Sequence, residues 1–186
     1  MITERIIPRG CERTQRKEEI KMFEWLRDHK KELHDDQVYA PADGILKNIM
    51  AASDPVFAAR AMGTGFIVKP ANNQVYAPVS GIVSMITDTK HAISIKMANG
   101  LEVLVHMGIN TVTLKGTPFV IDVKVGDFVK GGQVLAQMNL TAIAAAGLDN
   151  TIIIAITNTD TNLEKLTLTK TGDVHAGEVI GNVIAK

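Results

Sequence analysis

The chain has 186 residues, with 20 basic and 20 acidic side chains and 46% hydrophobic residues. This balanced charge argues against a nucleic-acid-binding protein, which normally carries a basic surface. The single cysteine, Cys11, excludes an internal disulfide framework and fits a reducing compartment. The sequence contains no run of 18 apolar residues and no apolar signal-peptide core at its start. We therefore expect a cytoplasmic protein without a membrane span.

The segment 1–36 differs in composition from the rest, with nine basic and nine acidic side chains and no strand-like run. Apolar residues within 17–33 approximate the spacing of one helix face, which predicts a short N-terminal helix or tail. A second hypothesis makes 1–21 a translated leader, because codons for Lys-Glu upstream of Met22 can form a ribosome-binding sequence. The mass of the native protein tests this hypothesis, and an amino terminus at Met1 would exclude it.

After residue 37 the sequence is typical of β-strands. The segments 37–46 and 74–83 repeat, with most positions identical, and we interpret them as pseudo-symmetric halves of one sheet fold. The apolar run 152–156 predicts a strand that is buried on both faces. Residues 140–146 predict one short helix, closed by Gly147. We expect an all-β domain over 37–186, an antiparallel β-sandwich or flattened barrel built as a duplicated barrel-sandwich hybrid.

Two histidines lie on one predicted hairpin. Two β-rich runs flank an Asn-Gly pair at 99–100, which is the strongest short-range signal of a hairpin. A two-residue turn there places Ile93 opposite His106, so that His91 becomes the diagonal neighbour of His106, roughly 7–8 Å away at the backbone. A shift of one residue in register would place the two imidazoles on opposite faces of the sheet.

Two imidazoles that converge on one face suggest phosphoryl transfer, a metal site or a proton relay. One neutral ring can attack phosphorus while the other donates a hydrogen bond to the phosphoryl oxygens. Zinc needs three or four ligands, of which His91 and His106 supply two, so an interface zinc at these residues is the alternative. The sequence lacks the hydrolase motif Gly-x-Ser-x-Gly and the nucleotide-binding phosphate loop, which favours a carrier over a kinase.

Eight segments of the sequence fit one family pattern in order and in spacing. They are Tyr-Ala-Pro-Ala-Asp-Gly at 39–44, Asp-Pro-Val-Phe-Ala at 54–58, 62–70, Thr-Lys-His-Ala-Ile-Ser at 89–94, Val-His-Met-Gly-Ile-Asn-Thr-Val at 105–112, 114–116, 125–127 and Thr-Asn-Thr-Asp at 157–160. On these segments the chain from about residue 36 to its end resembles the glucose-type enzyme IIA domains of the bacterial phosphoenolpyruvate:sugar phosphotransferase system. The resemblance implies a phosphoryl carrier that needs no nucleotide and no obligatory metal.

The resemblance also implies roles for individual residues. His106 would accept the phosphoryl group on Nε2, and His91 would steady that group without being phosphorylated itself. Thr89 would orient the His91 ring, and the main chain at Gly108 would hold the other nitrogen of His106. The partner-binding surface would be an apolar collar bordered by two acids, made of Val56, Phe57, Leu104, Met107, Val112, Asp54 and Asp160.

The partners that the resemblance implies are HPr as phosphoryl donor and a cysteine of the enzyme IIB of a sugar permease as acceptor. The protein would then be a phosphotransferase component of sugar uptake, cytoplasmic and recruited to the membrane by its permease. Asn110 stands where the family usually has Asp, which weakens the negative potential near the site. One alternative is a regulatory protein whose phosphorylation state gates binding to transporters or enzymes. Another is a biotinyl- or lipoyl-carrying module, which the sequence order around Lys96 disfavours.

Overall fold

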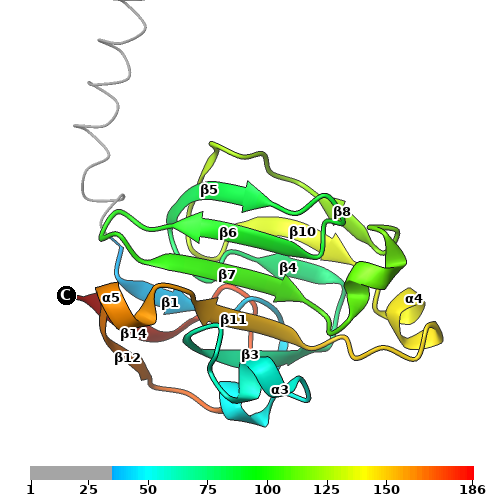
Figure 1. Ribbon diagram of the computed structural model, residues 1–186, viewed down its shortest axis with the longest axis horizontal. Coiled ribbons are helices and arrows are strands. Elements are labelled where there is room, and N and C mark those ends of the chain that lie inside the picture. The colour runs from blue at the N-terminus through cyan, green and yellow to red at the C-terminus, as the bar shows by residue number, and fades with distance from the viewer. Residues whose placement is uncertain (1–34) are drawn as a thin grey trace, which may run out of the picture.

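Antiparallel strand pairing organises residues 35–186, the part of the chain that this computed structural model describes (Figure 1). The elements in chain order are β1 (Gln37–Tyr39), β2 (Gly44–Asn48), η1 (Ile49–Ala51), α3 (Pro55–Ala58), β3 (Thr64–Pro70), β4 (Gln74–Tyr76), β5 (Gly81–Ile86), β6 (Ala92–Lys96), β7 (Glu102–Met107), η2 (Thr111–Leu114), β8 (Phe119–Ile121), β9 (Phe128–Val129), β10 (Val134–Met138), α4 (Leu140–Ala145), β11 (Ile152–Ile156), α5 (Thr159–Asn162), β12 (Leu163–Leu168), β13 (Gly172–Val174) and β14 (Val179–Ala185). The helix or tail and the leader that the sequence predicts fall in 1–34, outside the described residues.

The strands form one large sheet and two small ones. The large sheet has eight strands in the order β13-β2-β3-β11-β7-β6-β5-β9, and the small sheets have the orders β1-β14-β12 and β4-β10-β8. Figure 1 shows β4 and β10 behind β6 and β7. Every strand pair within 35–186 is antiparallel. The expectation of an all-β antiparallel sandwich is confirmed.

Strand β11 lies at the centre of the large sheet, between β3 and β7. All five of its residues are buried, as the apolar run predicted. Ile154 points into the main core between the sheets, whereas Ile153 packs in a second, smaller cluster on the opposite face. A central strand with apolar side chains on both faces needs cover on both sides. The second cluster supplies that cover beneath η1 and α3, and it forms the floor of the site described below.

The two sequence repeats make equivalent hydrogen bonds. The Tyr39 amide donates to the Pro78 carbonyl, and the Tyr76 amide donates to the Pro41 carbonyl, each at 2.8 Å. The repeats lead into β2 and β5, which are each second from one end of the large sheet. This reciprocity places a pseudo-twofold axis between β7 and β11, in agreement with two symmetric halves.

The predicted short helix is α4. Asn139 caps its amino end by accepting a hydrogen bond from the Ala142 amide, and Gly147 follows its end with φ at +72°. A left-handed glycine is the usual residue that closes a helix. Within residues 35–186 no helix is long and apolar enough to cross a membrane.

Candidate functional site

The hairpin that carries both histidines has a different register from the predicted one. Met97 and Leu101 close the loop, because the Met97 amide donates to the Leu101 carbonyl, so the loop has three residues. Its last residue, Gly100, has φ at +88°. A three-residue loop that ends in a left-handed glycine is the next most common hairpin connection after the two-residue turns. As a result His106 pairs with Ala92, which corrects the predicted pairing by one residue.

The two imidazoles nevertheless meet. Their ring centroids lie 5.1 Å apart in an edge-to-face arrangement with an interplanar angle of 81°. His91 precedes the first residue of β6, and Lys90 before it is left-handed with φ at +56°. Since His91 lies in a turn, the alternation of side chains along the strand does not decide the direction of its ring. The His91 carbonyl still accepts the Met107 amide at 2.7 Å, which fixes the turn beside β7.

Two threonine hydroxyls contact Nδ1 of His91. Thr89 Oγ1 lies 2.6 Å away, and Thr87 Oγ1 lies 3.3 Å away. The Thr87 hydroxyl also accepts the Ala92 amide, so it belongs to the turn itself. Sequence reasoning named Thr89 and missed Thr87, which only the turn geometry brings to the ring. With Nδ1 engaged by hydroxyl groups, Nε2 of His91 is available to a ligand.

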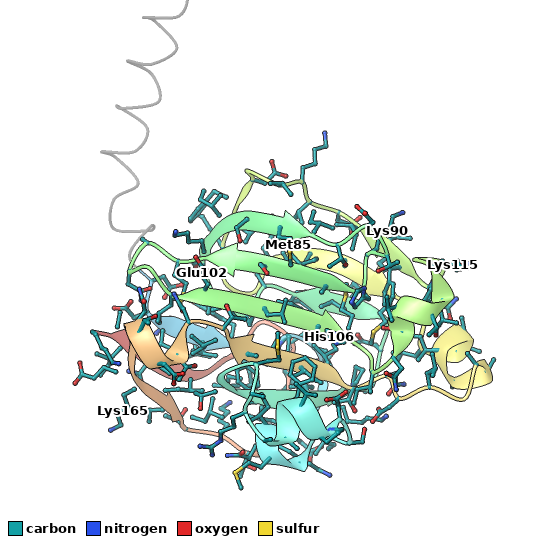
Figure 2. The ribbon with its side chains drawn as sticks, in the orientation of Figure 1. Met85, Lys90, Glu102, His106, Lys115 and Lys165 are labelled. Atoms are coloured by element: carbon teal, nitrogen blue, oxygen red, sulfur yellow. The ribbon has the colours of Figure 1, made fainter. Side chains whose placement is uncertain are left out.

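His106, which Figure 2 labels, lies on strand β7 and contacts both an aromatic ring and the second imidazole. The Phe57 ring centroid is 5.1 Å from that of His106 at an interplanar angle of 59°. Burial lowers the pKa of His106 to about 4, and a charge on His91 acts in the same direction. Asp54 and the Gly108 main chain act to raise this pKa but are outweighed. Burial also lowers the pKa of His91. Both rings are therefore mostly neutral at pH 7.

Nδ1 of His106 is buried, and it has no partner at ordinary hydrogen-bond geometry within the described residues 35–186. The Gly108 main chain, two residues further along the chain, lies close enough to the ring to raise its pKa. Gly108 has φ at +75°, and a Cβ there would lie 2.5 Å from Thr111 Cγ2. This position therefore requires glycine, both for its conformation and for its space.

Asp54 begins the helix that carries Phe57. Its Oδ1 accepts the Val56 amide at 2.8 Å and the Phe57 amide at 3.2 Å, and Pro55 takes the first helical position. Asp and Pro are preferred at these two positions, which explains why so short a helix forms here. The cap fixes the Phe57 ring against His106 and keeps the carboxylate close enough to raise the pKa of that histidine.

The predicted collar divides into exposed and buried members. Val56 and Val112 are 47% and 48% exposed and can contact a partner. Phe57 and Leu104 are each 7% exposed, and they pack in the cluster beneath the site. Met107 is completely buried in the main core on the opposite face of the sheet, because it follows His106 in strand β7. The prediction that Met107 belongs to the docking collar is therefore wrong.

The predicted acid Asp160 lies in α5, beyond the end of β11. It lines a cavity of about 270 Å³ together with Arg60 and Thr64. Thr64 pairs with Ile156, whereas His106 pairs with Ile153 three residues earlier on the same strand. Asp160 is consequently at the border of the site face, away from the histidine pair.

The donor set does not complete a zinc site. His91 and His106 offer two nitrogens, and residues 35–186 contain no group of three or more His, Cys, Asp or Glu side chains that could hold a metal. Tetrahedral zinc needs three or four ligands. A zinc ion at this pair would need further ligands from a partner protein, so the interface zinc stays a prediction.

Fold and site together define a class of protein: a pseudo-symmetric antiparallel β-sandwich that presents two neutral histidines on its large sheet. Residues 36–162 match the family described as phosphoenolpyruvate-dependent sugar phosphotransferase system, EIIA 1. The chain belongs to this family.

Similar proteins carry the same description. The chain is 39% identical over 141 residues to the PTS system glucose-specific EIIA component of Oceanobacillus iheyensis, covering 76% of this chain and 85% of that protein. It is 43% identical over 148 residues to the PTS system glucose-specific EIICBA component of Streptococcus pneumoniae, covering 80% of this chain but only 20% of that longer protein. Among solved structures, glucose permease IIA from Mycoplasma capricolum superimposes with a TM-score of 0.71 at 34% identity, covering 78% of this chain and 93% of that one.

Proposed function

We propose that this protein is a phosphoryl carrier of a sugar phosphotransferase system, with His106 as the phosphoryl acceptor. The observation that carries the proposal is the pair of ring centroids 5.1 Å apart, with His106 half-buried and neutral. A nucleophilic nitrogen must keep its lone pair, and a pKa of about 4 ensures this at pH 7. Membership of the EIIA 1 family supports the same assignment.

In the proposed reaction Nε2 of His106 attacks the phosphorus of a phosphohistidine on HPr. The P–N bond of the donor breaks as the new P–Nε2 bond forms, and the donor histidine takes back its lone pair. The proton of His106 stays on Nδ1, facing the Gly108 main chain, which raises the pKa of the ring by stabilising that N–H. In the second step a cysteine thiolate of an enzyme IIB attacks, the P–Nε2 bond breaks and a P–S bond forms.

The neighbouring His91 has a different proposed role. If the Thr89 hydroxyl donates to its Nδ1, the ring carries its proton on Nε2 and can donate it in a hydrogen bond to a phosphoryl oxygen. Phosphoryl transfer needs little covalent chemistry from the protein, so positioning and charge stabilisation supply most of the rate. His91 would therefore matter more for the rate of transfer than for the presence of phosphate.

The exposed side chains around the pair fit a transient protein partner. Val56 and Val112 provide apolar contact on two sides, and the Asp54 carboxylate provides negative charge. Asn110 is exposed and left-handed, with φ at +59°, a conformation that asparagine tolerates well. The proposal places the chain in the cytoplasm, where it meets its permease at the membrane.

The test is phosphorylation of the purified protein by phosphoenolpyruvate, enzyme I and HPr. Wild type and His91→Ala should gain the mass of one acid-labile phosphate, whereas His106→Ala should gain none. Transfer from phosphorylated His91→Ala to an enzyme IIB should be slower by about 100-fold, the usual effect of losing one oriented donor. His175→Ala is the matched control, since the His175 side chain is 89% exposed and belongs to another network.

Two results would contradict the proposal. Labelling of His106→Ala at the wild-type rate would move the acceptor to another residue. No labelling of wild type, under conditions where HPr is labelled, would favour the regulatory alternative, in which the chain only binds its partners.

A further inference from the structure

The carboxylate of Asp149 is engaged by three different segments of the chain. Its Oδ1 accepts hydrogen bonds from the Thr151 amide at 2.9 Å and from the Thr151 hydroxyl at 2.7 Å. The same oxygen accepts Lys69 Nζ at 2.7 Å, and Oδ2 accepts Ser53 Oγ at 2.7 Å. Four donors on one carboxylate hold the Asp149 side chain in a single orientation. Nothing in the sequence motifs singled out this residue.

Residues 149–151, which the Asp149 side chain holds in place, form hydrogen bonds with the chain that follows His106. The Gly108 amide donates to the Thr151 carbonyl at 3.0 Å, and the Ile109 amide donates to the Asp149 carbonyl at 2.8 Å. A Cβ at Gly108 would also lie 3.0 Å from that Asp149 carbonyl oxygen, so the two chain segments are in close contact. The position of the Gly108 main chain therefore depends on the conformation of 149–151.

The bond from Ser53 extends this support to the other side of the imidazole. Ser53 directly precedes Asp54, the cap of α3, and α3 carries the Phe57 ring that packs on His106. Asp149 is thus connected both to the main chain at Gly108 and Ile109, which follows His106, and to the helix whose Phe57 ring packs on His106. Lys69, on β3, ties the carboxylate to the sheet itself.

We propose that Asp149 is a positioning residue for His106: its carboxylate holds the Gly108 main chain against Nδ1 and so keeps the proton on Nδ1 and the lone pair on Nε2. Asp149 acts only through Gly108 and α3, and it takes no part in the bonds that form or break. The consequence for the carrier rests on the function proposed above. The tautomer of the ring does not, because it can be measured without any phosphoryl donor.

The charge of Asp149 fits this role. Burial acts to raise its pKa, but the hydrogen bonds from Lys69, Thr151 and Ser53 hold the pKa of the carboxyl well below its usual range. The group therefore stays an acceptor at any pH at which the protein would work. A carboxylate accepts hydrogen bonds on both oxygens, whereas an amide accepts on one only, so asparagine cannot reproduce the arrangement.

The experiment measures the His106 ring by ¹⁵N NMR in the full-length protein, for wild type, Asp149→Asn and Asp149→Ala. Wild type should show the tautomer with the proton on Nδ1, and both variants should show a mixture with the Nε2 tautomer. The turnover number for phosphoryl transfer from HPr should fall on the order of ten-fold, with KM for HPr unchanged, because the docking surface is intact.

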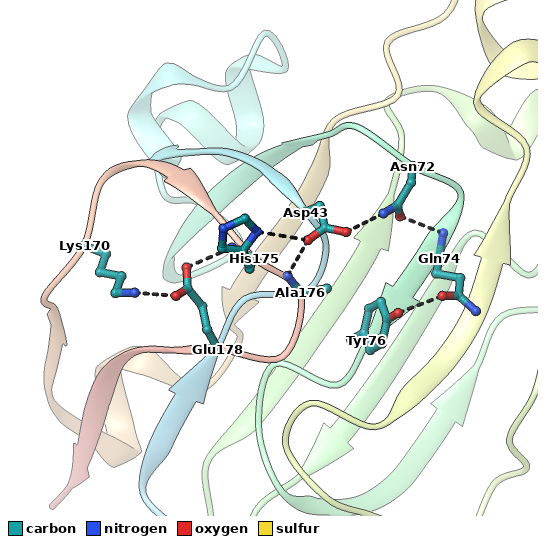
Figure 3. A network of polar contacts seen from close by, with 8 residues as sticks. All are labelled: Asp43, Asn72, Gln74, Tyr76, Lys170, His175, Ala176 and Glu178. Atoms are coloured by element: carbon teal, nitrogen blue, oxygen red, sulfur yellow. Dashed lines mark hydrogen bonds and ion pairs between the residues drawn. The ribbon is translucent and has the colours of Figure 1, made fainter.

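The matched control is Glu178→Ala. Figure 3 shows that Glu178 also accepts from a lysine, Lys170, and from a main-chain amide, that of His175, in a network that contains neither histidine of the site. This variant should leave the His106 tautomer and the turnover number unchanged.

The outcomes are separable. A wild-type tautomer in folded Asp149→Asn overturns the positioning role, whether or not the alanine variant folds. A shifted tautomer in the Asp149 variants, with no phosphorylation of wild type, supports the positioning role while the proposed carrier function fails.

Discussion

His106 is in a neutral and half-buried state that an ordinary surface histidine does not have. Its ring is covered by Phe57 and lies edge-to-face with His91, and this burial is the largest cause of its low pKa. A neutral ring has its lone pair ready, so the chain needs no separate base to remove a proton before attack. The same desolvation makes the stability of the fold depend on pH.

The low pKa predicts a loss of stability in mild acid. The pKa of His106 falls from 6.5 to about 4 on folding, so between these values the unfolded chain binds a proton that the folded chain does not. The contribution of His106 to the free energy of unfolding is fully present above pH 6.5. It is lost as the pH falls toward 4, and the loss reaches about 3 kcal/mol. Urea unfolding from pH 7.5 to 4.5 should show this slope in wild type and a shallower one in His106→Gln.

A control for the same measurement is His175→Gln, a change of the same chemistry at an exposed side chain. It should keep the wild-type slope. Parallel curves for wild type and His106→Gln would show that the ring titrates alike in the folded and unfolded chain, contrary to its burial.

The short helix α3 shows how one element serves both stability and chemistry. Asp54 caps the helix through the Val56 and Phe57 amides, and its charge raises the pKa of His106. Asparagine caps a helix about as well as aspartate but carries no charge. The two functions of Asp54 can therefore be separated by substitution.

We predict that Asp54→Ala lowers the free energy of unfolding by about 1 kcal/mol, whereas Asp54→Asn changes it little. Both variants should lower the pKa of His106 further, because both remove the carboxylate that raises it. Chemical denaturation gives the stability, and NMR titration of the ring gives the pKa. An equal loss of stability in the two variants would show that the charge of Asp54, and not its cap, supports α3.

The two pseudo-symmetric halves of residues 35–186 come into close contact at Gly132 and Gly177. Gly132 donates its amide to the Ala77 carbonyl and Gly177 donates its own to the Ala40 carbonyl, the same bond in each half. The two glycines touch: a Cβ on Gly132 would lie 3.2 Å from the Gly177 Cα. The halves can approach this closely only because neither residue carries a side chain.

We predict that Gly132→Ala destabilises the protein more than Gly147→Ala. Both glycines are left-handed, with φ at +79° and +72°, so both alanines cost about 1–2 kcal/mol of backbone strain. A Cβ at Gly147 meets nothing within 4 Å among the described atoms, whereas the one at Gly132 meets the opposite half. Thermal unfolding of both variants gives the comparison, and equal losses would mean that the halves separate at no cost.

The sequence by itself determined the features that rest on local chemistry: the β-rich domain, its internal repeat, the buried strand 152–156, the short helix closed by Gly147, and the two histidines on one hairpin. Periodicity and turn residues encode these directly. The tertiary structure decided the hairpin register, which differs by one residue because a three-residue loop and a left-handed Gly100 replaced the expected turn.

Tertiary contacts also decided what surrounds the site. Met107 is buried, whereas its neighbour His106 is partly exposed, because alternation along β7 sends them to opposite faces. Thr87 reaches the site from a turn, and Asp149 reaches it from a loop that is distant in the sequence. No spacing in the sequence predicts either residue. Thr87 acts within the turn that it shares with His91, whereas Asp149 acts through hydrogen bonds between segments that only the folded sheet brings together.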